Sequence, residues 1–495
     1  MKKAVLVFVV FCLFCIAGCV RQKYEARWES LVQYECPEWF RDAKFGIYCH
    51  WGPYSVPAYK NEWYSHWMYV KGHDIYHYHL GKYGALDRFG YKDFIPLFKA
   101  EKFDPKEWAD LFVKAGARFA GPVAEHADGF AMWDSDLTTW DAKERGPGRD
   151  VVGEMEKAIR SRGLKFITTL HHQWLYAWYP TMDRNTDASN PEYRDLYGPP
   201  VPSDYFNLAW SDSSFRVSEE FNQRWIKRAI EVVDKYHPDL VYFDSKLHII
   251  DEQYRIDFLR YFYNSAMRRK QDVVCTYKHE DMVTGAAVLD LERARMGSLS
   301  PVPWLTDDSM DWNSWCDVAD PEYKSSNRII DFIVDVVSKN GSVLLNIPPK
   351  ANGEIPAPVR ERLLEIGAWL EVNGEAIYGT RPWKICGEGP TEVVEGHLNE
   401  RQNKDMTWRD IRFTKKDEWL YIIVLDWPPE GQFQIKTLGG GYFSAPIKNL
   451  SFVSGTNSCT WTLEKAGLNI HVNGQKPNDF AYVFKVMLEA REGGH

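Results

Sequence analysis

The segment His237-Pro238-Asp239-Leu240-Val241-Tyr242-Phe243-Asp244 contains an uninterrupted apolar run that ends in a carboxylate. Helical patterns flank it, over residues 222–236 before the run and 254–269 after it. A short buried strand between amphipathic helices is typical of a parallel sheet with helical crossovers. The segment therefore predicts one βα unit, with Asp244 at the carboxyl end of its strand.

Similar units extend from this segment in both directions along the chain. Further helices are expected at 149–162 and 326–339, whereas the connections between the fifth, sixth and seventh strands are too short for a helix. We therefore predict an α/β fold, a degenerate (β/α)8 TIM-like barrel over residues 37–383. Its expected strands are 44–50, 119–125, 165–170, 239–244, 273–277, 287–292, 299–305 and 342–347.

The last part of the chain has a different pattern. After a final helix at 359–373, short alternating strands follow one another with turn residues between them, at 418–425, 449–453, 468–472 and 480–486. This pattern predicts a C-terminal antiparallel β-sandwich over residues 384–495. The sandwich either buttresses the barrel or binds sugar.

The N-terminus is typical of an exported protein. Lys2 and Lys3 precede an apolar run that ends in Ile16-Ala17-Gly18-Cys19, a pattern like that of a bacterial lipoprotein signal. We expect a signal peptide at 1–18, a lipid on Cys19, a tether at 19–36, and a place in the bacterial cell envelope, periplasmic or at the cell surface. The lipid anchor would then be the only contact with the membrane. A plain signal peptide or an uncleaved anchor is the alternative.

Composition narrows the class of partner. The formal net charge is -9 and no basic run occurs, which argues against nucleic acid. Aromatic residues make up 15% of the chain, with 21 Trp and 27 Tyr, and such rings either stack on sugars or fill a core. The six cysteines after Cys19 are scattered, so we expect mostly buried free thiols, with room for one disulfide, and no zinc site.

Polar residues unsuited to a core follow nearly every predicted strand. Because active sites of such barrels are built at the carboxyl ends of the strands, these residues are expected to converge on one pocket. The strand ends are His50-Trp51, Glu125-His126, His171-His172, Asp244-Ser245, Lys278-His279-Glu280, Glu292-Arg293 and 304–307.

Hydrolysis of a glycosidic bond needs two carboxyl groups on either side of the anomeric carbon. Asp244 is the first candidate because its strand places it at the barrel mouth. The alternative is that Asp244 caps the following helix, a common role for aspartate.

Several long motifs resemble the α-L-fucosidases of glycoside hydrolase family 29. They are residues 39–58 (WFRDAKFGIYCHWGPYSVPA), Asn61-Glu62-Trp63-Tyr64, residues 338–347 (SKNGSVLLNI) and residues 373–383 (NGEAIYGTRPW). The resemblance covers the whole predicted barrel. It implies a barrel followed by a β-sandwich, and retention of anomeric configuration through a covalent glycosyl-enzyme intermediate. We expect neither a cofactor nor a metal.

The resemblance also implies roles for single residues. Asp244 matches the nucleophile of the family, while His50 and His126, with the pair Glu62 and Trp63, match residues that hold the sugar hydroxyls. One of His171 and His172 should face the pocket, and we favour His172. The remaining candidates for substrate contact are Trp174, Tyr242, Arg293, Trp304 and Trp315.

Two departures from the family pattern affect the site. Ala127 replaces the second histidine of a common His-His-Asp-Gly-Phe motif, and Leu305 stands where many members carry the acid/base glutamate. We expect Glu292 to replace that glutamate, with Glu62 as the alternative and Asp307 or Asp308 as lesser candidates. The adjacent Arg293 would lower the pKa of Glu292, whereas a proton donor needs a raised pKa. In that case Glu292 and Arg293 form a structural or substrate-orienting pair.

These observations predict an exo-acting, retaining glycoside hydrolase that releases terminal α-L-fucose from a glycan or polysaccharide. Activity on α-L-galactosides is one alternative, because L-galactose differs from L-fucose by one hydroxyl group. A second is a glycan-binding lipoprotein without activity, and a metal-dependent hydrolase is a third, although no metal-ligand set has compelling spacing.

Overall fold

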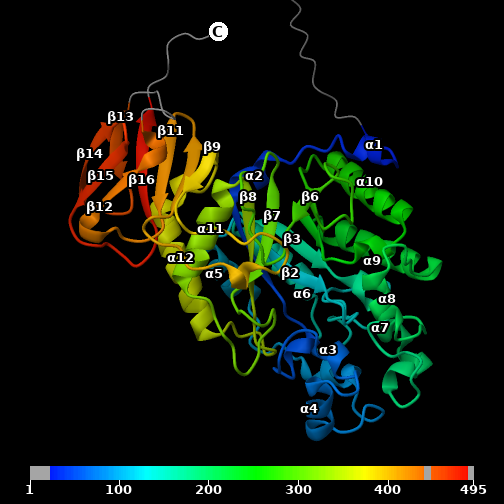
Figure 1. Ribbon diagram of the computed structural model, residues 1–495. Helices are drawn as coiled ribbons and strands as arrows, with labels where there is room; N and C mark the ends of the chain where they lie inside the picture. Colours follow the sequence, from blue (N-terminus) through cyan, green and yellow to red (C-terminus); the bar gives the residue numbers. More distant parts are fainter. Residues whose placement is uncertain (1–22, 440–446, 489–495) are drawn as a thin grey trace, which may run out of the picture.

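The computed structural model describes residues 23–439 and 447–488 (Figure 1). Eight parallel strands form a closed barrel in chain order, with β8 paired to β1. The predicted barrel class is confirmed. Its strands are β1 (Phe45–Cys49), β2 (Phe119–Glu125), β3 (Lys165–Leu170), β4 (Leu240–Phe243), β5 (Val274–Lys278), β6 (Val288–Asp290), β7 (Trp304–Ser309) and β8 (Gly341–Ile347).

The helices of the barrel also agree with the pattern in the sequence. The longer ones are α5 (Pro105–Lys114), α6 (Val151–Ser161), α9 (Glu219–Tyr236), α10 (Glu252–Arg268), α11 (Ser326–Ser338) and α12 (Ala357–Asn373). No helix lies between β5 and β7, which makes the barrel degenerate as expected. The shorter helices are α1 (Trp28–Leu31), α2 (Glu38–Ala43), α3 (Tyr64–Trp67), α4 (Asp74–Lys82), α7 (Arg194–Tyr197) and α8 (Tyr205–Ser211).

The predicted position of the seventh strand was wrong. The strand was expected at 299–305 but runs from Trp304 to Ser309, so Trp304 begins it. Pro301 and Pro303 lack the amide hydrogen that a ladder needs, which explains why this apolar stretch forms a loop. The short β6 joins β7 through one registered pair, Asp290 with Leu305.

The C-terminal part forms two antiparallel sheets that pack face to face, for example through Phe433 and Phe484. The first has the order β13-β16-β11-β10-β9 and the second β12-β15-β14. The strands are β9 (Arg381–Glu388), β10 (Ile411–Lys416), β11 (Trp419–Val424), β12 (Gln432–Ile435), β13 (Ile447–Phe452), β14 (Ser458–Glu464), β15 (Gly467–Asn473) and β16 (Tyr482–Leu488).

The first sheet lies against the barrel (Figure 1). Its strands β9 and β10 contact α11, and Arg412 donates a hydrogen bond of 2.6 Å to the buried Asp335 of that helix. The boundary predicted between residues 383 and 384 falls inside β9.

The predicted signal peptide and Cys19 lie outside the described residues. Within the described ranges, no helix is both long and apolar enough to cross a bilayer. The six cysteines found there, Cys36, Cys49, Cys275, Cys316, Cys386 and Cys459, are all free thiols.

Candidate active site

A pocket of about 220 Å³ opens at the carboxyl ends of the barrel strands. Each of the seven predicted strand ends contributes at least one residue to it, although these ends are far apart in the sequence. Its wall consists of His50, Glu62, Trp63, His126, His171, Trp174, Trp210, Tyr242, Asp244, Ser245, Lys278, Glu292, Asp307, Trp315, His397 and Leu398.

Two carboxyl groups in this pocket share one lysine. The Lys278 Nζ donates to Asp244 Oδ1 at 3.0 Å and to Glu292 Oε2 at 2.5 Å. The two carboxyl oxygens are therefore no more than 5.5 Å apart, the combined length of these bonds. Retaining glycosidases hold their two carboxyl groups about 5 to 5.5 Å apart.

Asp244 does not cap a helix, because the next helical segments begin at Leu247 and Glu252. Burial alone would raise its pKa, but the charge of Lys278 and its hydrogen bond outweigh burial and hold the pKa well below its usual range. Asp244 therefore remains an anion across the physiological range, as a nucleophile requires.

Glu292 has the opposite character. Burial raises its pKa to about 7, and the negative charges of Asp307 and Asp244 add to this effect against the lowering effect of Lys278. The cation beside Glu292 is Lys278 and not Arg293, which was expected to lower this pKa. One carboxyl group that stays ionised beside one that holds a proton near neutral pH is the division of roles found in glycosidases.

Lys278 lies among acidic and aromatic side chains at the end of β5. Asp290 Oδ2 and Asp307 Oδ1 each lie 3.7 Å from its Nζ, and the ring of Tyr242 is 5.2 Å away. Asp307 also accepts hydrogen bonds from the hydroxyls of Tyr48, at 2.7 Å, and Tyr242, at 3.1 Å. Asp307 is thus held in place as an acceptor.

Three histidines form the wall of the pocket beside β1, β2 and β3. Ring nitrogens of His50, His126 and His171 lie within 4.8 Å of one another. Burial lowers the pKa of all three, and that of His171 to about 4, so the rings are neutral at neutral pH. Within the described residues neither ring nitrogen of His171 has a hydrogen-bond partner, and Nδ1 of His126 has none.

Neutral imidazoles of this kind each offer one donor and one acceptor, which suits the hydroxyl groups of a sugar. His50 is oriented by Asn346, whose Oδ1 accepts from the His50 amide at 2.8 Å and lies 2.9 Å from its Nδ1. The same nitrogen cluster has a spacing that metal ions accept, a grouping that the sequence pattern did not reveal.

The preference for His172 over His171 was wrong. His172 points away from the pocket, where its Nδ1 lies 2.6 Å from Glu125 Oε1 and its ring stacks on Phe221. Glu125 also accepts from Arg228 at 2.7 Å. A 3₁₀ turn begins at His172 and ends the alternation of the strand, so His171 faces the pocket instead.

Tryptophans form the apolar part of the wall. Trp63 and Trp174 meet edge to face at 5.1 Å, and Trp174 meets Trp210 in the same way at 4.7 Å. Trp315 lies 5.2 Å from the ring of His50. These four rings offer flat apolar surface for a sugar ring or a methyl group.

Two predicted contacts are contradicted by the structure. Trp304 is fully buried at the start of β7, at the opposite end of the barrel from the pocket, and donates to the carbonyl of Lys339. Arg293 lies behind Trp315, with its guanidinium 4.5 Å above that ring and a hydrogen bond of 2.6 Å to the carbonyl of Trp312. Arg293 therefore supports Trp315 and does not line the pocket.

Glu62 is buried in the wall, where its Oε2 accepts from the amide of Trp315 at 2.9 Å. Burial raises its pKa. Of the lesser acid/base candidates, Asp307 is engaged by two tyrosines, and Asp308 forms an ion pair of 2.7 Å with Lys324 outside the pocket. Leu305 packs in the barrel interior.

Sequence reasoning missed several residues of the pocket. Lys278 was predicted at a strand end without a role, because its contacts with Asp244 and Glu292 are not visible in the sequence. Trp210 comes from α8, and His397 and Leu398 come from the segment after β9, which the sequence assigns to the sandwich. No local pattern in the sequence brings these residues to the barrel mouth.

Comparisons with known proteins agree with this architecture. The family model described as alpha-L-fucosidase matches residues 14–375. Tissue alpha-L-fucosidase of Rattus norvegicus is 31% identical over 433 residues, which cover 85% of this chain and 83% of the relative. The human tissue enzyme is 30% identical over 429 residues, 84% and 81% of the two chains.

Solved structures give the same result. The structure of Thermotoga maritima alpha-fucosidase in complex with fucose matches with a TM-score of 0.74 at 29% identity, over 94% of this chain and 100% of the other. With the family model matched across most of its length, the chain belongs to the α-L-fucosidase family of glycoside hydrolases.

Proposed function

We propose that the protein is a retaining exo-α-L-fucosidase with Asp244 as nucleophile and Glu292 as acid/base. The observation that carries this proposal is the pair of carboxyl groups on Lys278, no more than 5.5 Å apart and with pKa values shifted in opposite directions. The relatives named above are α-L-fucosidases, and the Thermotoga structure was determined with fucose.

The two groups divide the reaction into two displacements. In the first, Asp244 forms a bond to the anomeric carbon while the bond to the leaving oxygen breaks and Glu292 gives that oxygen its proton. In the second, Glu292 takes a proton from water, whose oxygen replaces Asp244 at the anomeric carbon. Two inversions restore the original configuration.

L-Fucose is the sugar that we favour over L-galactose. The apolar wall of Trp63, Trp174 and Trp210 suits the 6-methyl group of fucose, whereas a 6-hydroxyl group against these rings would lose hydrogen bonds to water. The neutral histidines on the other side supply partners for the ring hydroxyls.

The first expected result is turnover of 4-nitrophenyl α-L-fucoside with release of the α-anomer of L-fucose first. Proton NMR recorded within the first minutes distinguishes this product from the β-anomer that an inverting enzyme would release. The matching α-L-galactoside should react at least about tenfold more slowly, given the usual cost of one misplaced hydroxyl. The assay contains EDTA, so that activity under these conditions also argues against a required metal.

The β-anomer as first product would contradict the assignment of Asp244. Faster turnover of the galactoside would make the protein an α-L-galactosidase. Absence of turnover for both substrates would favour a glycan-binding protein without activity.

A second prediction concerns Lys278. Its positive charge lowers the pKa of both Asp244 and Glu292. Lys278→Met should therefore raise both values and move both limbs of the pH profile of kcat/KM to higher pH. In the wild type we expect the alkaline limb near pH 7, where Glu292 loses its proton, and an acidic limb below about pH 4, where His171 and then Asp244 gain one.

Lys278→Arg keeps the charge and serves as the matched control, with limbs expected close to those of the wild type. Circular dichroism and thermal unfolding would check that both variants fold. Identical profiles for Lys278→Met and the wild type would show that Lys278 does not set the two pKa values.

We also propose that the protein is an exported lipoprotein anchored through Cys19. This proposal rests on the sequence Ile16-Ala17-Gly18-Cys19 after a short apolar run. Labelling with a fatty-acid probe in a bacterial host should mark the wild type and not Cys19→Ala. Equal labelling of both would contradict it.

A further inference from the structure

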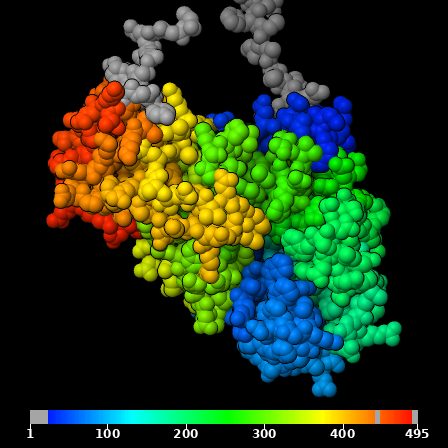
Figure 2. Space-filling model, in the orientation of Figure 1, coloured from blue at the N-terminus to red at the C-terminus, as the bar shows by residue number. Residues whose placement is uncertain are grey.

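A segment from the C-terminal part of the chain completes the barrel mouth on one side. We call residues 394–403, between β9 and β10, the rim segment. His397 and Leu398 of this segment line the catalytic pocket. In Figure 2 the yellow-orange surface of this part of the chain lies across the green surface of the barrel.

The rim segment is fixed to the barrel next to Glu292. The amide of Leu398 donates to the carbonyl of Glu292 at 2.9 Å, and the amide of Glu400 donates to the carbonyl of Arg293 at 2.8 Å. The two acceptor carbonyls belong to the main chain shortly after the end of β6. The position of Glu292 and that of the rim segment are therefore coupled.

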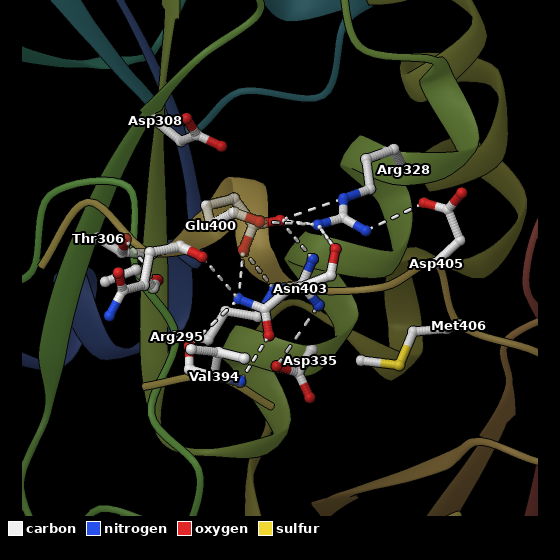
Figure 3. A network of polar contacts seen from close by, with 12 residues as sticks. Arg295, Thr306, Asp308, Arg328, Asp335, Val394, Glu400, Asn403, Asp405 and Met406 are labelled. Carbon is white, nitrogen blue, oxygen red and sulfur yellow. Dashed lines mark hydrogen bonds and ion pairs between the residues drawn. The ribbon is translucent and has the colours of Figure 1, made fainter. Parts of the chain in front are cut away.

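A buried ionic network holds the other end of the segment (Figure 3). The carboxylate of Glu400 accepts two hydrogen bonds of 2.7 Å from Arg295 and one of 2.6 Å from Arg328. Asn403 closes the segment on itself, because its Oδ1 accepts from the amide of Val394 at 2.8 Å. Buried, bidentate pairs of this kind keep the segment in one conformation.

The position of the segment in the barrel decides which part of a substrate it meets. The three histidines of β1 to β3 occupy one arc of the mouth, while Glu292 and the rim segment occupy the opposite arc, beside β5 to β7. Because Glu292 protonates the leaving oxygen, the group attached to that oxygen must lie on the side of Glu292. His397 Nε2 is 3.8 Å from Glu292 Oε2, so it borders this space.

The two side chains have the chemistry of a sugar subsite. Burial lowers the pKa of His397 to about 4, which leaves a neutral ring able to hydrogen-bond a hydroxyl group. Leu398 is 53% exposed and offers an apolar surface to the face of a ring.

The space continues beyond Leu398. This residue also borders a neighbouring hollow of about 280 Å³, whose wall includes Trp312, Asn313 and Arg401. Cations already lie over the ring of Trp312, with Lys324 Nζ at 4.4 Å and the Arg401 guanidinium at 5.5 Å. The polar side chains of Asn313 and Arg401 are therefore the groups suited to hydrogen bonding to a further sugar residue. A small aglycone would leave this second hollow unused.

We propose that His397 and Leu398 form the leaving-group subsite and that it takes a pyranose residue of an oligosaccharide whose chain continues over Leu398 toward Trp312. The proposal rests on the α-L-fucosidase activity proposed above. The rim segment, a loop between two strands of the sandwich, thus sets the preference for the leaving group.

The test compares substrates that differ only in the leaving group. α-L-Fucosyl fluoride releases a single atom and cannot contact the subsite, whereas 2′-fucosyllactose and 3-fucosyllactose release a disaccharide. Leu398→Asn and His397→Ala should each lower kcat/KM for the better of the two trisaccharides roughly tenfold more than they lower that for the fluoride. This factor corresponds to the loss of one good contact.

Asparagine is chosen because Leu398 has a φ of 63°, a backbone region that asparagine tolerates. Leu463→Asn replaces a similarly exposed leucine on the distant strand β14 and is the matched control, expected to behave as the wild type. Thermal unfolding of each variant accompanies the kinetics.

The outcomes distinguish a failure of the subsite proposal from a failure of the proposed α-L-fucosidase activity. If the wild type does not hydrolyse the fluoride, the proposed function fails. If it hydrolyses the fluoride but neither trisaccharide, the oligosaccharide subsite is wrong. Equal losses on fluoride and trisaccharide, or no loss on either, would also overturn the subsite.

Discussion

Asp244→Gly is expected to lower kcat/KM for 4-nitrophenyl α-L-fucoside by about 10⁴-fold or more, since the variant has no group to form the covalent intermediate. Asp244 directly follows β4, which is paired with both β3 and β5. The loss should therefore come from chemistry and not from misfolding. Steady-state kinetics and thermal unfolding measure the two separately.

Azide gives a second readout for the same variant. The small anion can occupy the space of the missing carboxylate and attack the anomeric carbon from that side, so that the product is the β-configured fucosyl azide. Asp204→Gly, at an exposed position before α8, is the control and should keep full activity. An active Asp244→Gly variant, or one that azide does not rescue, would contradict the role of Asp244.

Glu292→Gln is expected to have the second largest effect, and the effect should depend on the leaving group. Without a proton donor, kcat/KM for fucosyllactose should fall by about 10² to 10⁴-fold. The first step with α-L-fucosyl fluoride, whose leaving group needs little protonation, should change far less. Added azide should give the α-configured fucosyl azide, because the covalent intermediate on Asp244 still forms.

Glu62→Gln distinguishes the two acid/base candidates. Glu62 is fixed by the amide of Trp315, so we expect it to contact the sugar and to affect both substrates equally, without rescue by azide. If Glu62→Gln instead shows the leaving-group dependence, the two roles must be exchanged. If neither variant loses activity, both assignments are wrong.

The sequence predicted those parts of the site that depend on local pattern. An apolar run between two helices located β4 and placed Asp244 at the barrel mouth, and similar patterns placed His50, His126 and Glu292. The barrel itself followed from the same periodicity. Strand ends are local features, so they can be recognised without knowledge of the contacts that form later.

The errors arose where local pattern does not determine geometry. His171 and His172 are adjacent. Which of them faces the pocket depends on a 3₁₀ turn that the sequence pattern does not predict. Arg293 was expected to lower the pKa of Glu292. Its backbone has a positive φ of 44° and its guanidinium lies over the ring of Trp315. Lys278 lies beside the carboxyl group of Glu292 instead. Such outcomes depend on tertiary packing.

The short strand β6 has a consequence for how the two chemical roles are supported. β6 ends before Glu292, but Leu291 and Arg293 on either side of Glu292 still donate main-chain bonds to β7. Leu398, more than a hundred positions later, adds a main-chain bond to the carbonyl of Glu292 itself. Asp244 follows β4, which is paired on both sides within the barrel, and is supported without bonds from the described residues of the C-terminal part. If Asp244 and Glu292 act as proposed, bond formation to the sugar depends on the closed ring of strands alone, whereas delivery of the proton depends on both parts of the polypeptide.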